Sequence, residues 1–299
     1  MPERRRLRSQ KARAEPLSVR ANVHIHVEFP PFFTHSIALL ACRTQGKDRC
    51  GAQNQNQIGQ EATMTMRGET IKNMLLGLAG TVVMICLAVS LTVWFRPLYY
   101  FDIDYLDIPQ SSGVSAELCR LNYDALIDYN VPGGSAKLTF PTMPMSESGR
   151  KHFEEVKDIF LAMQWVAVLG LAVFGIYLLR DAVRTGKMRE AAAFHAAHTL
   201  RLRYRWMLWA VWLAAGIGGI VLLAVIIDWE NAFTLMHKIF FDNDDWLFNP
   251  QTDPIITILP DTFFMHCGLL IIGLTILFCA GLQLLYHRKT RNTHGKSHF

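Results

Sequence analysis

The chain has 299 residues, of which 51% are hydrophobic, and its formal net charge is +5. All of that excess lies before Met64, where ten Lys or Arg stand against five Asp or Glu; from Met64 onward each sign occurs twenty times. The charges balance over the rest of the chain, so nucleic acid is not an expected partner.

Residues 1–65 form a basic extension with no sustained helical or alternating pattern, ending in the polar run "GAQNQNQIGQ". We expect this extension to be disordered, and it need not belong to the native protein. No apolar core of a signal peptide joins its "RRR" to its "SIALLAC". The start is therefore open between Met1, Met64 and Met66, with the two later positions preferred.

Four stretches of the chain contain no Asp, Glu, Lys or Arg, and each is about long enough to cross the hydrocarbon of a bilayer as a helix. Soluble domains rarely keep every long helix free of charge, which argues against four buried helices of a soluble core. We therefore expect an all-α membrane protein with four transmembrane helices, at residues 66–95, 159–179, 206–227 and 262–287.

Lys and Arg in the short connections set the orientation of a membrane protein. The connection 180–205 carries seven Lys or Arg and two acids, and the tail 288–299 carries four and none, whereas the connection 228–261 has one Lys and seven acids. We expect a cytoplasmic basic loop, both termini in the cytoplasm, and the segments 96–158 and 228–261 outside. The protein is then a multi-pass protein of a cell membrane.

The segment 96–158 is the only place for a small extracellular domain. "NYDALIDYN" (122–130) predicts an amphipathic helix, "VPGG" (131–134) a turn and "AKLTF" (136–140) a strand. Ser146 and Ser148 are plausible N-caps for a helix that runs into the second span. Because the segment is too small for a large core of its own, we expect it to form a cap on the ends of the four helices.

His152 lies near the start of that helix, ahead of Glu155 and Lys157. Residues three apart share a helix face, so Glu155 is placed to hold the imidazole or to raise its pKa. The alternative is an ordinary surface histidine beside solvated charges.

His237 lies in the stretch "LMHKIFFDNDDWLFNP" (235–250), which combines one histidine with three aspartates and four aromatic rings. Trp246 alone would be explained as an interfacial anchor, but anchors do not require carboxylates close to a histidine. A polar pocket walled by rings, with Phe241 and its aromatic neighbours, is the sharper interpretation. Pro250, Pro254 and Pro260 predict that the loop beyond "MHKIFF" is extended and folded back.

Other histidines carry a weaker signal. His195 and His198 form an HxxH pair in the basic loop, which alone is a poor indicator of a metal site. His266, at the outer start of the fourth span, is placed to line the same pocket as His152 and His237.

At these residues the chain resembles a known family. "SESGRKHFEEVKDIF" and "LMHKIFFDNDDWLFNPQTDPIITILPDTFFMHC" are similar to the two signature segments of the bacterial lipoprotein intramolecular transacylases, and "NYDALIDYN" is similar to that family's outer loop. The resemblance runs from about Met66 to Tyr286. Asn249 and Asp261 depart from it, since Asp and Glu are expected there.

The resemblance implies an enzyme with four membrane helices under an extracellular cap. It implies transfer of the sn-2 acyl chain of an S-diacylglyceryl-cysteine lipoprotein onto that cysteine's α-amino group, leaving the lyso-form. His152 and His237 would be the catalytic pair, with Glu155 and Lys157 in support and no cofactor or metal. Residues expected to bind the lipoprotein and its lipid are Tyr123, Phe241, Asn243, Asp245, Trp246, Asp253 and His266.

Two rival functions stay open at this stage. A metal-dependent membrane hydrolase would use the two histidines and the aspartates as ligands, and a non-catalytic scaffold for lipoproteins would use neither. The sequence leaves open which histidine is the base and which is the acid, and it leaves the oligomeric state and the chain-length preference open.

Overall fold

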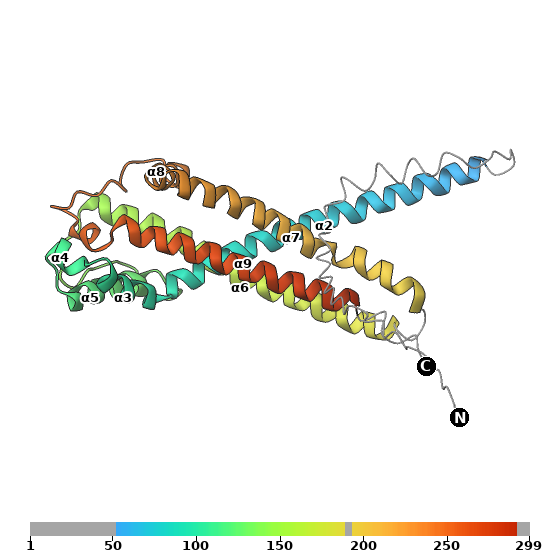
Figure 1. The fold of residues 1–299 in the computed structure, drawn as a ribbon, viewed down its shortest axis with the longest axis horizontal. Helices are drawn as coiled ribbons and strands as arrows, with labels where there is room; N and C mark the ends of the chain where they lie inside the picture. Colours follow the sequence, from blue (N-terminus) through green and yellow to red (C-terminus); the bar gives the residue numbers. More distant parts are fainter. Residues whose placement is uncertain (1–51, 189–192, 292–299) are drawn as a thin grey trace, which may run out of the picture. The chain divides into compact units, whose positions relative to one another are not determined.

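A computed structural model describes residues 52–188 and 193–291, and those residues form helices and connecting loops without a strand (Figure 1). The helices are α2 (Ala52–Trp94), α3 (Arg96–Tyr105), α4 (Ile108–Ser112), α5 (Ala116–Tyr129), α6 (Glu147–Met188), α7 (Ala193–Ile227), α8 (Trp229–Phe240), η1 (Pro254–Ile258) and α9 (Asp261–Arg291). Four of them, α2, α6, α7 and α9, are long and apolar enough to cross a membrane. The predicted all-α fold with four membrane helices is confirmed.

The four long helices pack through small residues. α2 contacts α6, α7 and α9, and α7 contacts α9. A Cβ added to Gly77 of α2 would lie 2.4 Å from the Cβ of Trp209 in α7, and one added to Gly170 of α6 would lie 2.2 Å from a methyl group of Val83 in α2. Glycines thus permit the close helix contacts typical of membrane bundles, where burial from water supplies no driving force.

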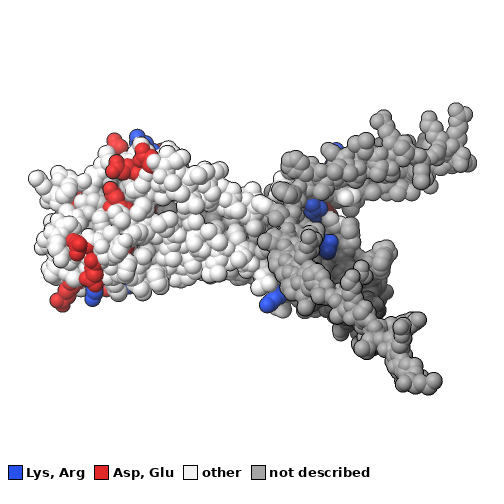
Figure 2. Space-filling view, viewed as in Figure 1, with Lys and Arg blue, Asp and Glu red and all other residues white. Residues whose placement is uncertain are grey.

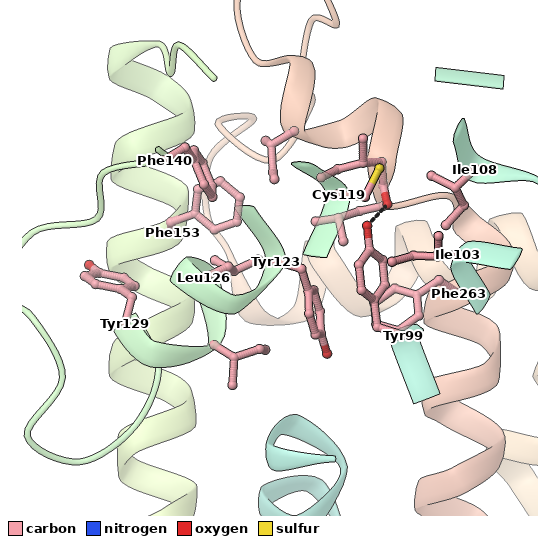
Figure 3. Close-up of a cluster of buried hydrophobic side chains, with 14 of the residues drawn as sticks. Tyr99, Ile103, Ile108, Cys119, Tyr123, Leu126, Tyr129, Phe140, Phe153 and Phe263 are labelled. Carbon is pink, nitrogen blue, oxygen red and sulfur yellow. Dashed lines mark hydrogen bonds between the residues drawn. The ribbon is translucent and has the colours of Figure 1, made fainter. Parts of the chain in front are cut away.

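Residues 96–146, which we call the cap, gather at one end of these helices, the cap end (Figure 1). A buried cluster of aromatic and aliphatic side chains joins α3, α4 and α5 to η1 and the first turns of α9 (Figure 3). At its centre the ring of Tyr99 stacks on Tyr123 at 3.9 Å, and the Tyr99 hydroxyl donates to the carbonyl of Ile258 at 2.8 Å. The cap therefore shares its core with the loop before the last span.

Charged side chains are distributed unevenly along the length of the four helices. On the face drawn in Figure 2, the Asp and Glu side chains gather at the cap end, and the middle of the four helices shows neither sign. The other end of the helices carries Arg180, Arg184, Arg201, Arg203 and Arg205, and we call it the basic end.

Within the cap, the expected helix at 122–130 is the second half of α5, and "VPGG" forms a turn as predicted. The strand expected at "AKLTF" is wrong, because the described residues offer no partner strand. That segment is irregular, and its Leu138 and Phe140 are buried in the cap core. Ser146 is the N-cap of α6, since its hydroxyl accepts from the amide of Gly149 at 3.0 Å, and the helix continues unbroken into the membrane span.

Two other expectations need correction or lie outside the described residues. Residues 52–65, expected to lack a fold, are the first turns of α2. The rest of the predicted disordered extension, residues 1–51, lies outside the described residues, as do the side chains of the HxxH pair.

The third span and the stretch that holds His237 are separate helices. The chain turns at Asp228, which is the N-cap of α8 and accepts from the amide of Asn231 at 3.0 Å. Beyond α8, residues 241–253 form an irregular segment, as the prolines predicted.

Candidate active site

Two histidines from different helices converge at the cap end. His152 lies in the second turn of α6 and His237 in the last turn of α8, and their ring centroids are 5.9 Å apart. Both side chains are buried, with 5% and 8% of their surface exposed. The predicted meeting of the two imidazoles is therefore present.

The orientation of the His237 ring is fixed by its own helix. Its Nδ1 lies 2.9 Å from the carbonyl oxygen of Phe233, one turn earlier. A carbonyl only accepts hydrogen bonds, so Nδ1 carries the proton and Nε2 of the neutral ring holds a free lone pair. Burial lowers the pKa of this imidazole below its usual value, although the bond to Phe233 opposes the shift. His237 is thus held in the form that accepts a proton at neutral pH.

His152 is held by aromatic contacts instead of hydrogen bonds. Its Nδ1 is buried and has no partner in the part of the chain that the structure describes. The rings of Phe241 and Phe248 pack against the imidazole of His152 in edge-to-face arrangements, with their centroids 4.7 and 5.4 Å from its own. A buried polar atom without a hydrogen-bond partner costs folding free energy and is rare in native proteins. Where one occurs, it often belongs to a functional site.

Aromatic rings also enclose His237. Trp246 stacks on the imidazole at 4.8 Å, and Phe233 and Phe241 lie at 4.3 and 5.8 Å. The two histidines therefore share a site walled almost entirely by rings, as expected for a pocket that receives apolar matter and excludes water.

The loop that carries Trp246 is fastened to α6 by polar contacts. The side-chain amide of Asn243 donates to both carboxylate oxygens of Glu155, at 3.0 and 3.1 Å. The backbone carbonyl of Asn243 accepts from the Trp246 indole at 3.0 Å, and Lys151 pairs with Asp245 at 2.6 Å. Glu155 thus supports the site through Asn243. It does not hold the imidazole of His152, so that sequence-based interpretation is wrong.

Asp253 fastens the end of the same loop to the start of α6. Its buried carboxylate accepts from the backbone amide of Ser146 at 2.7 Å and from the hydroxyl of Thr252 at 2.7 Å. Gly149 faces it so closely that an added Cβ would lie 2.3 Å from Asp253 Oδ1 and 3.2 Å from a ring carbon of Phe248. Asp253 and the Phe248 ring therefore both pack closely against Gly149 at the start of α6.

Three predicted site residues lie elsewhere. Tyr123 is buried in the cap core between Tyr99 and Phe263, where burial raises the pKa of its phenol. Lys157 donates to the carbonyl of Ser135 at 2.6 Å and lies over the Tyr129 ring, so it fastens the cap to α6.

The third of these residues, His266, pairs with the buried carboxylate of Asp102, with Nδ1 at 2.9 and 3.0 Å from its two oxygens. Its placement beside His152 and His237 is not supported. It joins α9 to α3.

Sequence reasoning missed Phe233 as a neighbour of His237, and it counted Phe248 among the rings of the pocket without predicting its contact with His152. Phe233 could have been found, because it precedes His237 by four residues, which is one helical turn. Phe248 reaches His152 only through the fold of the irregular segment, for which the sequence holds no periodic signal.

The polar groups of the site do not gather as a set of metal ligands. Among the residues described, no three His, Cys, Asp or Glu side chains are grouped to hold a metal ion. Asp245 and Asp253, which the hydrolase alternative would use as ligands, have Lys151, Ser146 and Thr252 as partners.

The chain is similar to a known protein family and to solved structures. The sequence model of a family described as the lipoprotein intramolecular transacylase Lit matches residues 74–264. The structure is similar to the membrane-integral lipoprotein intramolecular transacylase Lit of Bacillus cereus, with a TM-score of 0.61 and 31% identity over 76% of this chain and 99% of that one.

Structures of that Bacillus cereus protein with one histidine replaced are similar too. The Arg variant has 29% identity and a TM-score of 0.60 over 79% of this chain and 99% of that one, and the Ala variant has 28% and 0.61 over 78% and 98%. Comparison with curated protein sequences gives no match.

Proposed function

Because this chain belongs to the lipoprotein intramolecular transacylase family, we propose that His152 and His237 carry out its acyl transfer, from the sn-2 position of an S-diacylglyceryl-cysteine lipoprotein onto the α-amino group of the same cysteine. The product is the lyso-form, with an N-acyl chain and an S-monoacylglyceryl group. The observation that carries the proposal is the convergence of two buried imidazoles, 5.9 Å apart, from α6 and α8.

The reaction exchanges one ester for one amide. The α-amino group has a pKa of about 8 and is mostly protonated at neutral pH, so it must lose a proton before it attacks. A bond forms between the amine nitrogen and the ester carbonyl carbon, and negative charge develops on the carbonyl oxygen. The bond from that carbon to the sn-2 oxygen then breaks, and this oxygen takes up a proton as the free hydroxyl.

The two histidines have different roles in this sequence. His237 is the base: its Nδ1–H donates to the Phe233 carbonyl, which leaves Nε2 free to accept a proton. The ammonium releases its first proton to solvent, and Nε2 takes the second proton from the nitrogen as it attacks and returns it to the leaving sn-2 oxygen. The carbonyl oxygen that stabilises Nδ1–H also favours the cation formed in between. His152 is the donor whose imidazole N–H stabilises the charge on the carbonyl oxygen.

The aromatic site contributes to catalysis in two ways: it holds the amine and the ester together, and it excludes water. Amine and ester belong to one flexible headgroup, and holding them in contact contributes up to about 7–11 kcal/mol of barrier lowering in the best cases. Phe241, Phe248 and Trp246 leave little room for water beside the imidazoles. Water excluded in this way cannot hydrolyse the ester in place of the amine.

The residues that surround the pair hold it in position. Asn243, Asp245 and Asp253 fasten the loop to α6, and Glu155 and Lys151 are their partners there. The lipoprotein's lipid contacts the rings of Phe241 and Trp246. Tyr123, His266 and Lys157 act on the cap and not on the substrate.

The cap end faces the outside of the cell. Support comes from the excess of Lys and Arg in residues 180–205 and 288–299, which is typical of cytoplasmic connections. The diacylated lipoprotein then reaches the histidines from the outer leaflet.

The test is tandem mass spectrometry of lipoprotein N-termini from cells that make the wild-type chain, His152→Ala, His237→Ala or the double variant. The wild type should convert the N-terminus into an isomer of unchanged mass, with the amine blocked and one chain fewer on the glycerol. Each single variant should lose at least about 100-fold in rate, and the double variant should lose little more, because the pair acts as a unit. Full conversion by the double variant would defeat the proposal, and chelator-sensitive products split by water would favour a metal hydrolase.

A further inference from the structure

A second hollow lies at the basic end of the helices, far along α6 from the histidines. It has a volume of about 350 Å³ and is lined by Val173, Ile176, Tyr177, Arg180, Asp181, Arg184 and Arg203. All of these residues belong to α6 except Arg203, which comes from α7. The volume falls in the range of sites that hold small ligands or lipid headgroups.

The charges in this hollow leave a positive excess. Asp181 is buried, pairs with Arg203 at 2.6 Å and accepts a hydrogen bond from the hydroxyl of Tyr204. That carboxylate therefore offsets Arg203 and joins α6 to α7. Arg180 and Arg184 lie one turn apart on α6, and in the described part of the chain no hydrogen bond or ion pair engages either guanidinium. The acid that lines the hollow, Asp181, pairs with Arg203, so among the described residues Arg180 and Arg184 leave a positive excess there.

The other wall of the hollow is apolar. Val173, Ile176 and Tyr177 precede the arginines on α6, and behind them Trp206 of α7 stacks on Phe174 at 5.0 Å. Val173, Ile176 and Tyr177 belong to the charge-free stretch 159–179, which lies in the hydrocarbon, whereas the arginines of α6 begin directly after it. The hollow therefore changes from apolar to cationic at the depth where lipid phosphates lie.

We propose that this hollow is a binding site for one anionic phospholipid of the leaflet at the basic end. Arg180 and Arg184 hold the phosphate, because two guanidinium groups at adjacent turns present planar donors to its oxygens. The acyl chains lie along Val173 and Ile176, and the Tyr177 ring lies at the glycerol. A soluble phosphate would gain nothing from that apolar wall, so the site is matched to a lipid. It is independent of the acyl-transfer chemistry.

Native mass spectrometry of the purified full chain tests the site. The protein in detergent is titrated with phosphatidylglycerol or with phosphatidylcholine of the same acyl chains. We expect one retained phosphatidylglycerol and an affinity about 30-fold lower in the Arg180→Gln/Arg184→Gln variant, since each cation near an anionic surface contributes about fivefold. The matched control is Arg201→Gln/Arg288→Gln, which removes two exposed charges at the same end outside the hollow.

Three outcomes would overturn the proposal. One is equal loss of affinity in the two double variants, which would indicate general attraction only; a second is equal retention of phosphatidylcholine. The third is displacement by millimolar inorganic phosphate, which would make the hollow a site for a free anion. The unfolding temperature of each variant, measured in phosphatidylcholine, shows whether it is folded. If a double variant is not folded, its two single variants are used instead, and each Arg180 or Arg184 single variant should bind about fivefold more weakly than the wild type. His152→Ala should bind the lipid as the wild type does, so the failure of either proposal is visible without the other.

Discussion

Replacing Gly149 with alanine should damage the active site from a position that touches neither histidine. Gly149 lies in the first turn of α6, and a Cβ there would stand 2.3 Å from Asp253 Oδ1 and 3.2 Å from a ring carbon of Phe248. The carboxylate of Asp253 is buried and bonded to the amide of Ser146, so it cannot move aside without losing that bond. The added Cβ would also press on the Phe248 ring, whose centroid lies 5.4 Å from that of His152, and so disturb this contact.

The expected magnitude follows from two opposing effects. Alanine in place of glycine stabilises a helix by about 0.5–1 kcal/mol. Loss of a hydrogen bond to a charged, buried carboxylate costs about 1.5–3 kcal/mol. The net result is a destabilisation of about 1–2 kcal/mol where helix propensity alone predicts a gain. Displacement of the aromatic wall by about 1 Å should lower the rate up to 100-fold.

The assay is conversion of a synthetic diacylated lipopeptide, followed by liquid chromatography and mass spectrometry, together with the unfolding temperature in detergent. Gly175→Ala is the matched control, because Gly175 belongs to the same helix and an added Cβ there meets nothing within 4 Å. This control should be as active as the wild type and more stable by about 0.5–1 kcal/mol, since only the helix propensity changes. The reasoning is refuted if Gly149→Ala and Gly175→Ala behave alike in both measurements.

Further predictions concern the base and the loop that supports it. Burial lowers the pKa of His237, so its protonation should reduce kcat/KM only below a pH of about 6.5. The profile is first corrected for titration of the substrate amine, and a break at or above that pH contradicts a buried base. Asn243→Asp would set a carboxylate about 3 Å from the oxygens of Glu155 and should cost about 2 kcal/mol of stability as well as activity, while adding Glu155→Gln should restore most of both. No rescue in the double variant would show that this contact does not support the site. Lys151→Ala removes an ion pair whose lysine is 55% exposed and should change the free energy of unfolding by less than about 0.5 kcal/mol, measured by thermal denaturation; a loss above about 2 kcal/mol would mean that the pair is part of the core.

The four membrane helices were predictable because the bilayer imposes one simple requirement on sequence, about twenty residues without charge. The helices of the cap are subject to no comparable constraint on their sequence. Short helices such as α3 and α4 are formed by packing on η1 and α9, and their sequences carry little periodicity. "AKLTF" alternates in the manner of a strand, yet its alternation buries Leu138 and Phe140 against helices.

Site residues were predictable where a single short segment of the sequence contains all the residues that meet at the site. His237 and Trp246 lie within ten residues of each other, and both are at the site. Helical spacing placed Glu155 on the face of His152, but spacing identifies a face and not a partner, and Asn243 from the distant loop takes the carboxylate. His266 was misplaced because its partner, Asp102, belongs to α3, which the sequence had not revealed.

The length of α6 has a consequence for the energy of the lipid. His152 precedes the charge-free stretch by seven residues, so it stands about 10 Å beyond the edge of the hydrocarbon. Lifting a fatty tail that far into water would uncover roughly eight methylene groups, at a cost of about 6 kcal/mol. In the proposed reaction, the rings of Phe241, Phe248 and Trp246 would replace the hydrocarbon around the tail beside the imidazoles, so that it would change its point of attachment with little exposure to water.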